Sequence, residues 1–187
     1  MIVGLHDAER DHLPGKTFPN FALMKLSTYH KARGDTVEIW NPLMNLVPHH
    51  YDVVYSSKVF DFTPENEYLP ANTIKGGTGY GLAANGKYAE LPPEVDSCFP
   101  DYSIYPECDY AIGYITRGCP NKCRWCVVPR KEGTIRPYSD WRDIVRPDTK
   151  KLVLMDNNIL ASEYGLKQLA ELSRTDYRVD LNQRLYH

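Results

Sequence analysis

Short runs of apolar and β-branched residues alternate along the chain with helical or loop segments, and this alternation limits the folds that the chain can adopt. The pattern predicts an amphipathic helix over residues 19–33, with Gly34 suited to the C-terminal cap. It predicts strands at residues 1–6, 36–40, 51–56 and, more weakly, 72–75. Strands separated by a helix or a long loop pair in parallel, so residues 1–83 predict a Rossmann-like α/β domain with a parallel sheet of about four strands.

The periodic pattern stops in the middle of the chain and then resumes. Residues 84–109 contain Pro92, Pro93, Pro100 and Pro106 without periodicity, which predicts an extended linker. Strands are predicted at 110–116, 151–155 and 177–181, and Ser162 can cap a helix between the last two. The 78 residues of 110–187 would supply roughly two and a half βα units of a barrel. We therefore expect a small open sheet or part of a larger barrel, truncated at the C-terminus.

Composition places the chain among globular proteins and excludes several other classes. Of the 187 residues, 42% are hydrophobic and 25% are charged, and the formal net charge is -2. Bulk charge therefore gives no support for a nucleic-acid or membrane-surface binder. No apolar run approaches the roughly 18 residues that span a bilayer, and the first residues lack the charged and apolar regions of a signal peptide. We expect a cytoplasmic protein without a membrane partner.

The five cysteines carry the most chemical information. An odd number of cysteines in a chain with no export signal argues against a disulfide framework. Three of them, Cys119, Cys123 and Cys126, form a C-x3-C-x2-C motif directly after a predicted strand. Three thiolates on one short loop can bind three irons of a [4Fe–4S] cluster, which leaves the fourth iron open to another ligand. Soft sulfur ligands also suit zinc.

A structural zinc site is the alternative to an iron–sulfur cluster. Its fourth ligand would be Cys108, Cys98 or a histidine. Structural zinc sites usually contain paired C-x2-C knuckles separated by a longer stretch, and this sequence has no second pair. The motif therefore favours an open iron–sulfur cluster, with Cys98 and Cys108 as incidental thiols of the predicted linker.

The cysteine motif, with Trp125 just before its last cysteine, resembles the signature of radical S-adenosylmethionine enzymes. The flanking stretches Gly113–Cys119 and Val127–Gly133 are similar to an uncharacterised branch of that superfamily, in which a cobalamin-domain-like Rossmann half precedes the radical domain. The stretches 18–25, 74–80 and 155–162 also look familial. The resemblance covers most of the chain, and only the cysteine motif is specific to a chemistry. It implies that residues 110–187 form a partial (β/α) radical S-adenosylmethionine barrel.

The resemblance also implies cofactors, partners and site residues. Cys119, Cys123 and Cys126 would hold a [4Fe–4S] cluster whose open iron binds S-adenosylmethionine, and a flavodoxin- or ferredoxin-like protein would supply the electron. Trp125 would pack near the adenine. Many family members carry a Gly-Gly-Glu segment after the second strand, where this chain has Asp156, Asn157 and Asn158. Asn182 and Gln183 follow the third strand and would also face the cofactor. The sequence does not identify the substrate, and it leaves open whether the chain is a monomer or a homo-oligomer.

The sequence contains two weaker motifs, and it leaves two alternative functions open. Cobalamin binders carry D-x-H-x-x-G, and the nearest match, around His12, has Arg10 in place of the aspartate, so we predict no cobalamin. The glycine-rich run 76–81 lacks the G-x-G-x-x-G pattern and predicts a tight turn. The stretch with residues 127–129 and Gly133 is also similar to radical methylthiotransferases that modify transfer RNA. Those enzymes carry three further cysteines in the N-terminal half, whereas this sequence has none before Cys98, so this function ranks second. A non-catalytic fragment that binds zinc or an iron–sulfur cluster is the other alternative.

Overall fold

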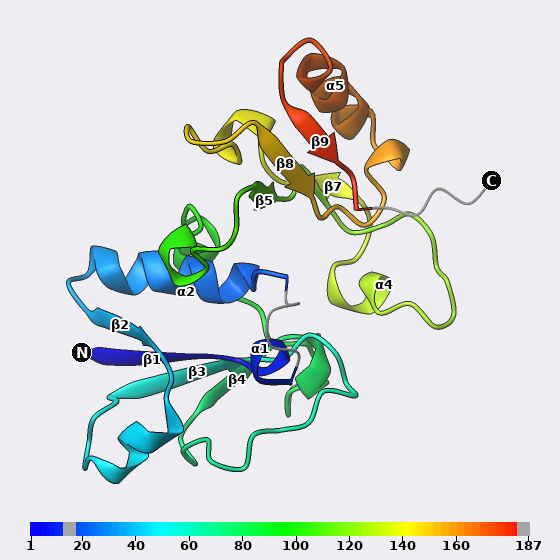
Figure 1. Cartoon of the computed structure of the whole chain (residues 1–187). Coiled ribbons are helices and arrows are strands. Elements are labelled where there is room, and N and C mark those ends of the chain that lie inside the picture. Colours follow the sequence, from blue (N-terminus) through cyan, green and yellow to red (C-terminus); the bar gives the residue numbers. More distant parts are fainter. Residues whose placement is uncertain (13–17, 183–187) are drawn as a thin grey trace. The chain divides into compact units, whose positions relative to one another are not determined.

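The computed structural model describes residues 1–12 and 18–182, and it divides the chain into two compact units, Met1–Pro106 and Glu107–His187 (Figure 1). Each unit contains its own parallel sheet. Within the described residues, no helix is both long enough and apolar enough to cross a bilayer.

The first unit is built on a four-stranded parallel sheet, as the strand pattern predicts. Its strands lie in the order β2-β1-β3-β4. They are β1 (Ile2–Asp7), β2 (Thr36–Ile39), β3 (Val53–Ser57) and β4 (Ile74–Gly76). All three pairings are parallel. The central strand β1 is buried from Val3 to Asp7, as expected for a strand with a neighbour on both sides. This order, 2-1-3-4, matches the start of one of the two common strand orders of doubly wound α/β sheets, 2-1-3-4-5.

Helix α2 (Phe21–Ala32) packs against the strands of this sheet. Asn20 caps its first turn by accepting a hydrogen bond from the Leu23 amide at 3.3 Å. Leu23, Met24 and Leu26 are buried. After the helix the chain turns at Gly34, whose φ of 82° is in the left-handed region that glycine adopts without strain. The helix therefore begins two residues later than the sequence predicts and ends next to the predicted glycine.

Three short helical segments accompany the strands of the first unit, two between strands and one after the last strand. Helix α1 (Ala8–His12) follows β1 directly, and the 3-10 segment η1 (Pro42–Leu46) lies between β2 and β3. The glycine-rich run forms a second 3-10 turn, η2 (Thr78–Tyr80), as predicted. A Cβ at Gly77 would meet the Lys58 carbonyl oxygen at 2.3 Å, and one at Gly79 would meet that of Phe60 at 2.4 Å. These glycines therefore allow two backbone segments to approach closely.

The stretch expected to be a linker is divided between the two units. Up to Pro106 it belongs to the first unit and contains α3 (Pro93–Asp96) and the 3-10 segment η3 (Tyr102–Ile104). The Lys25 ammonium pairs with Asp96 at 2.9 Å. The buried Tyr105 hydroxyl donates to Asp7 at 2.6 Å. This segment packs through scattered anchors rather than a repeating apolar pattern, which is why periodicity does not reveal it.

The second unit contains a three-stranded parallel sheet in the order β5-β8-β9. The strands are β5 (Ala111–Gly113), β8 (Lys151–Leu154) and β9 (Arg178–Asp180). Helix α5 (Glu163–Leu172) connects β8 to β9, and Ser162 caps it as predicted by accepting from the Gly165 amide. Ala111, Leu152, Leu154 and Leu172 belong to one buried core. The described part of this unit is therefore a parallel three-stranded sheet covered by a helix on one face.

Five smaller elements of the described part of the second unit lie outside this sheet. Strands β6 (Thr116–Arg117) and β7 (Arg136–Pro137) form a separate antiparallel pair. Helix α4 (Val128–Lys131) lies between them in the chain. The 3-10 segments η4 (Trp141–Asp143) and η5 (Ile159–Ala161) flank β8 in sequence. The β6–β7 pair matters most here, because the three clustered cysteines lie on the loop that it closes.

Candidate metal and cofactor site

The cysteine loop has a closed base. In the β6–β7 pair, Thr116 lies opposite Pro137 and Arg117 opposite Arg136. Two residues after Arg117, the Cys119 amide donates to the Gly133 carbonyl at 3.2 Å. Gly118 has a φ of 85°, and a Cβ there would meet the Thr134 carbonyl oxygen at 2.3 Å. Glycine is therefore required where the two sides of the stem approach, just before the first cysteine.

Glu132 ties the stem together from inside the loop. One carboxylate oxygen pairs with the Arg117 guanidinium at 2.9 Å, and the other accepts from the Gly118 amide at 3.0 Å. The Glu132 side chain is only 10% exposed. The Arg117 guanidinium also stacks over the Tyr114 ring, 4.1 Å from its centroid. A buried carboxylate with charged and amide partners holds both sides of the stem in one arrangement.

The three clustered thiols are free and accessible to different degrees. Cys119 and Cys126 are half-buried, and Cys123 is exposed. The Cys126 amide donates to the Cys123 carbonyl at 3.1 Å, so the C-x2-C half of the motif forms a tight turn. Over residues 1–12 and 18–182, no three His, Cys, Asp or Glu side chains are gathered closely enough to hold a metal. Three free thiols on one loop are a donor set that fits an iron–sulfur cluster or zinc, although their sulfurs are not gathered in this arrangement.

Asp156, two residues after β8, stabilises the base of the cysteine loop. It is 4% exposed, and its carboxylate accepts hydrogen bonds from the Ile115 amide at 3.1 Å, the Thr116 amide, and the Thr116 hydroxyl at 2.6 Å. Burial raises the pKa of Asp156, although these hydrogen bonds act to lower it. The carboxylate proposed from sequence as a cofactor ligand is thus engaged with the turn that joins β5 to β6.

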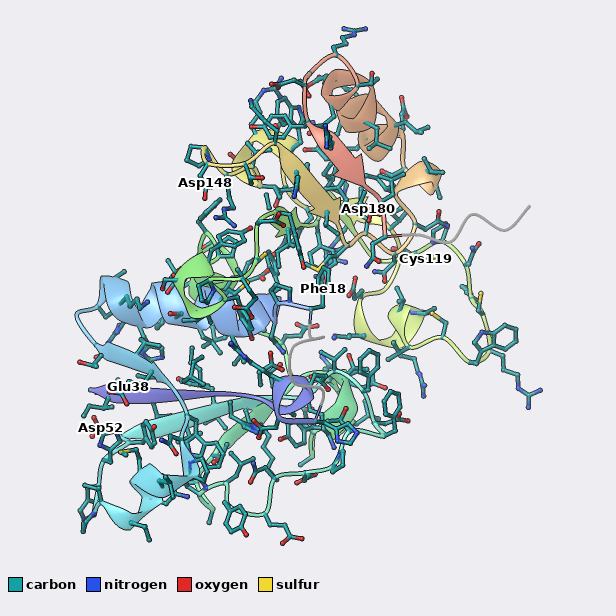
Figure 2. All side chains as sticks on the ribbon, viewed as in Figure 1. Phe18, Glu38, Asp52, Cys119, Asp148 and Asp180 are labelled. Carbon is teal, nitrogen blue, oxygen red and sulfur yellow. The ribbon has the colours of Figure 1, made fainter. Side chains whose placement is uncertain are left out.

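The two residues after Asp156 reach the cysteine loop itself. The Asn157 side-chain amide donates to Glu132 at 2.8 Å. The Asn158 side-chain nitrogen lies 3.8 Å from the Cys119 sulfur, within range of an N–H···S hydrogen bond. The structure therefore brings together two of the predicted site segments, 119–126 and 156–158, although Cys119 and Asn158 lie 39 positions apart in the sequence. Figure 2 labels Cys119 at this position.

The remaining predicted cofactor residues lie apart from this contact. Trp125 is 88% exposed at the tip of the loop. Asn182 follows β9 with a φ of 46°, and its amide donates to the Asp180 carboxylate at 2.8 Å. Gln183 lies outside the described residues. Of the predicted cofactor-binding residues, Asn157 and Asn158 are thus the ones that contact the loop through a hydrogen bond in the described structure.

Cys98 and Cys108 occupy different surroundings from the clustered thiols. The Cys108 thiol is buried and donates to the Tyr110 carbonyl at 3.3 Å. Burial raises the pKa of Cys108, which favours the protonated thiol over the thiolate that metals bind. Cys98 belongs to the first unit, where its thiol donates to the Glu94 carbonyl at 3.3 Å. Each of these cysteines therefore has a local role in its own unit.

Two residues that shape the base of the cysteine loop, Arg117 and Glu132, belong to no sequence motif. An acidic residue among the basic ones that follow the cysteines is a local signal of this role.

The first unit contains a hydrogen-bonded network that the sequence does not predict. Buried His6 bonds to Asp11 at 2.8 Å and to Ser56 at 2.7 Å. The Ser56 hydroxyl bonds in turn to Tyr80 at 2.6 Å. This chain links α1, β3 and η2, whereas His12, the residue considered for cobalt, is exposed.

Comparison with family models, with curated proteins and with solved structures found no match to this chain. The evidence for its function is therefore the chemistry of the cysteine loop and the contacts around it.

Proposed function

We propose that the chain is a radical S-adenosylmethionine iron–sulfur protein. In this proposal Cys119, Cys123 and Cys126 hold a [4Fe–4S] cluster, and residues 110–187 are part of the corresponding (β/α) barrel. The observation that carries the proposal is the meeting of the cysteine loop with Asn158, at the end of the neighbouring parallel strand, 3.8 Å from the Cys119 sulfur. Ligands of parallel α/β sheets lie beyond the carboxyl ends of the strands, where both segments begin.

The protein's own residues would perform three tasks around the cluster. Glu132 and Asp156 hold the base of the loop through their buried hydrogen bonds. The Asn158 N–H would donate to the Cys119 sulfur, a type of contact that tunes the reduction potential of iron–sulfur clusters. The amide oxygens of Asn157 and Asn158 are acceptors for the ammonium group of a bound methionine moiety.

When bound, the cluster would transfer one electron to S-adenosylmethionine and cleave it into methionine and a 5′-deoxyadenosyl radical, which takes a hydrogen atom from a substrate. The loop has only three cysteines, so the fourth iron is left for that cofactor. The exposed basic side chains on the loop suit an acidic electron donor such as a flavodoxin or a ferredoxin. They are Lys122, Arg124 and Arg130.

Anaerobic reconstitution with iron and sulfide tests the proposal. We expect about four irons per chain and a brown protein that absorbs at about 400 nm. After dithionite and S-adenosylmethionine are added, methionine and 5′-deoxyadenosine should appear in equal amounts. Cys123→Ala should abolish both the cluster and the cleavage. Cys98→Ala removes a thiol of the first unit and is the matched control, which should retain both.

The same experiment separates the alternatives. A colourless protein that binds zinc through the three cysteines would contradict the proposal and support a structural metal site. A cluster of four irons that does not cleave S-adenosylmethionine would contradict the enzymatic part and leave a cluster-binding fragment.

A further inference from the structure

Four polar side chains of the first unit form one hydrogen-bonded chain, in the order Asp11, His6, Ser56 and Tyr80. The His6 Nε2 atom lies 2.8 Å from the Asp11 carboxylate, and His6 Nδ1 lies 2.7 Å from the Ser56 hydroxyl. The Ser56 hydroxyl lies 2.6 Å from that of Tyr80. His6 and Ser56 are buried, whereas the Asp11 side chain is 51% exposed and Tyr80 is half-buried. The chain therefore passes through a buried region from an exposed carboxylate to an accessible phenol.

This chain lies at the carboxyl ends of neighbouring strands of the first sheet. His6 of β1 and Ser56 of β3 are partners in the parallel register. Asp11 belongs to α1, which follows β1 directly, and Tyr80 is the last residue of η2, which follows β4. Strands β2 and β3 lie on opposite sides of β1. Open parallel sheets bind their ligands at such a position, beyond the carboxyl ends of the strands.

Charge sets the direction of the hydrogen bonds in the chain. The bond with His6 is the main cause that lowers the pKa of Asp11, so its carboxylate is ionised and can only accept. The His6 Nε2 atom therefore carries a proton, and Nδ1 of the neutral imidazole is an acceptor. It follows that the Ser56 hydroxyl donates to His6 and accepts from the Tyr80 hydroxyl. Every donor in the chain thus points towards Asp11.

The surroundings of Tyr80 keep its hydroxyl protonated at rest. Burial is the main cause that raises the pKa of Tyr80, and the carboxylates of Glu9 and Glu65 act in the same direction. The hydrogen bond with Ser56 and the Lys75 ammonium, 5.3 Å from the ring centroid, act to lower it. The resting group is therefore the neutral phenol, which needs a base to lose its proton at neutral pH.

We propose that Tyr80 is the acid–base group of a second site, in the first unit, for a small molecule that presents a hydroxyl or carbonyl oxygen. When a substrate hydroxyl gives its proton to the Tyr80 oxygen, Tyr80 gives its own proton to Ser56, and Ser56 gives one to His6 Nδ1. The transfer leaves a substrate alkoxide and an imidazolium, which the Asp11 carboxylate stabilises. The reverse transfer protonates an oxyanion formed from a carbonyl group. The inference is independent of the proposed function.

Acetylation of the full chain by N-acetylimidazole at neutral pH tests the base that serves Tyr80. The acetyl–oxygen bond forms at Tyr80 as its proton passes to Ser56, and the departing imidazole takes a proton from water. Mass spectrometry of peptides gives the rate at each tyrosine, and Tyr68, which is 70% exposed, is the internal reference. We expect Ser56→Ala to slow acetylation of Tyr80 relative to Tyr68 by at least about tenfold, because the phenol loses its path to the base.

Variants of Asp11 test the relay without altering its buried members. Asp11→Asn removes the charge that stabilises the imidazolium and should slow the relative acetylation of Tyr80 by about tenfold, whereas Asp11→Glu restores a carboxylate and should recover most of the rate. Asp61→Asn changes another exposed aspartate of the first unit and is the matched control. A parent chain in which Tyr80 is not acetylated would overturn the proposal. So would a rate at Tyr80 that Asp11→Asn leaves unchanged, whatever Ser56→Ala does to folding.

Discussion

Gly118 is the residue at which the backbone places the strictest demand on the candidate site. Gly118 has a positive φ, and a Cβ built there would lie 2.3 Å from the Thr134 carbonyl oxygen. A backbone movement that relieved either constraint would also move Cys119. Gly133, on the other side of the stem, also has a positive φ of 74°, yet nothing lies within 4 Å of a Cβ built there. A side chain at Gly133 would therefore cause backbone strain alone, whereas a side chain at Gly118 would cause both backbone strain and a steric clash.

Gly118→Ala should open the base of the cysteine loop, whereas Gly133→Ala should only strain it. We expect Gly133→Ala to lower the free energy of unfolding by about 1 kcal/mol, the usual penalty for a left-handed alanine. Gly118→Ala should cost at least about 3 kcal/mol and expose the amides of 115–119 to hydrogen exchange. Thermal unfolding and amide exchange measure both effects. Equal costs for the two variants would show that the contact with Thr134 is not limiting.

At the scale of elements, α2 and the segment 97–104 are joined by Asp101. Its carboxylate accepts from the Ser27 hydroxyl and the Lys31 ammonium, both at 2.6 Å, and from the Ser103 amide at 2.9 Å. Burial acts to raise the pKa of Asp101, but these bonds outweigh it and lower the pKa to about 2. The ionised carboxylate therefore fastens a segment without apolar periodicity to the main helix of the first unit.

Acid should loosen this attachment. The pKa of Asp101 is lower in the folded chain than the ordinary 3.8, so its contribution is fully present above about pH 4 and is lost as the pH falls towards 2. Asp101→Asn should lower the free energy of unfolding at pH 7 by about 1–2 kcal/mol, reduced from the full shift because the group is partly exposed. It should also flatten the stability profile between about pH 4 and 2. Denaturant titrations across that range test this, with the exposed Asp61→Asn as control. A parallel loss at every pH would point to packing instead of charge.

At the scale of the whole molecule, each unit carries its own parallel sheet and its own buried residues. In the first unit, β1 is buried between two neighbours and α2 packs on the sheet. Val95, Ile104 and Tyr105, from the segment that follows the four strands, are buried as well. The unit is therefore complete only when that segment is included, up to Pro106.

A chain of residues 1–106 should consequently fold alone, and a chain of residues 1–83 should not. The longer chain keeps Tyr105 and the bonds of Asp96 and Asp101, whereas the shorter one exposes the surface that they cover. Cooperative thermal unfolding followed by circular dichroism distinguishes the two. Equal, cooperative transitions for both chains would show that residues 84–106 contribute little to the unit.

Part of this fold could be predicted because it depends on residues that lie close together in the sequence. Four strands and the main helix of the first unit follow from side-chain periodicity, since burial of one face selects the residues of a single element. The helix caps Asn20, Gly34 and Ser162 lie at or next to the positions that cap chemistry favours. The C-x3-C-x2-C motif likewise lies within eight residues, so its donor chemistry is visible without the fold.

Local sequence patterns are sufficient to predict the parallel α/β class, most element positions and the cysteine donor set. Three features emerge only in the folded chain: residues 84–106 belong to the first unit, Asp156 holds the Ile115–Thr116 turn, and Asn158 lies next to Cys119. The physical reason is separation along the chain. Asp156 and Thr116 lie 40 positions apart, and their contact depends on how two parallel strands are brought side by side rather than on the period of either strand.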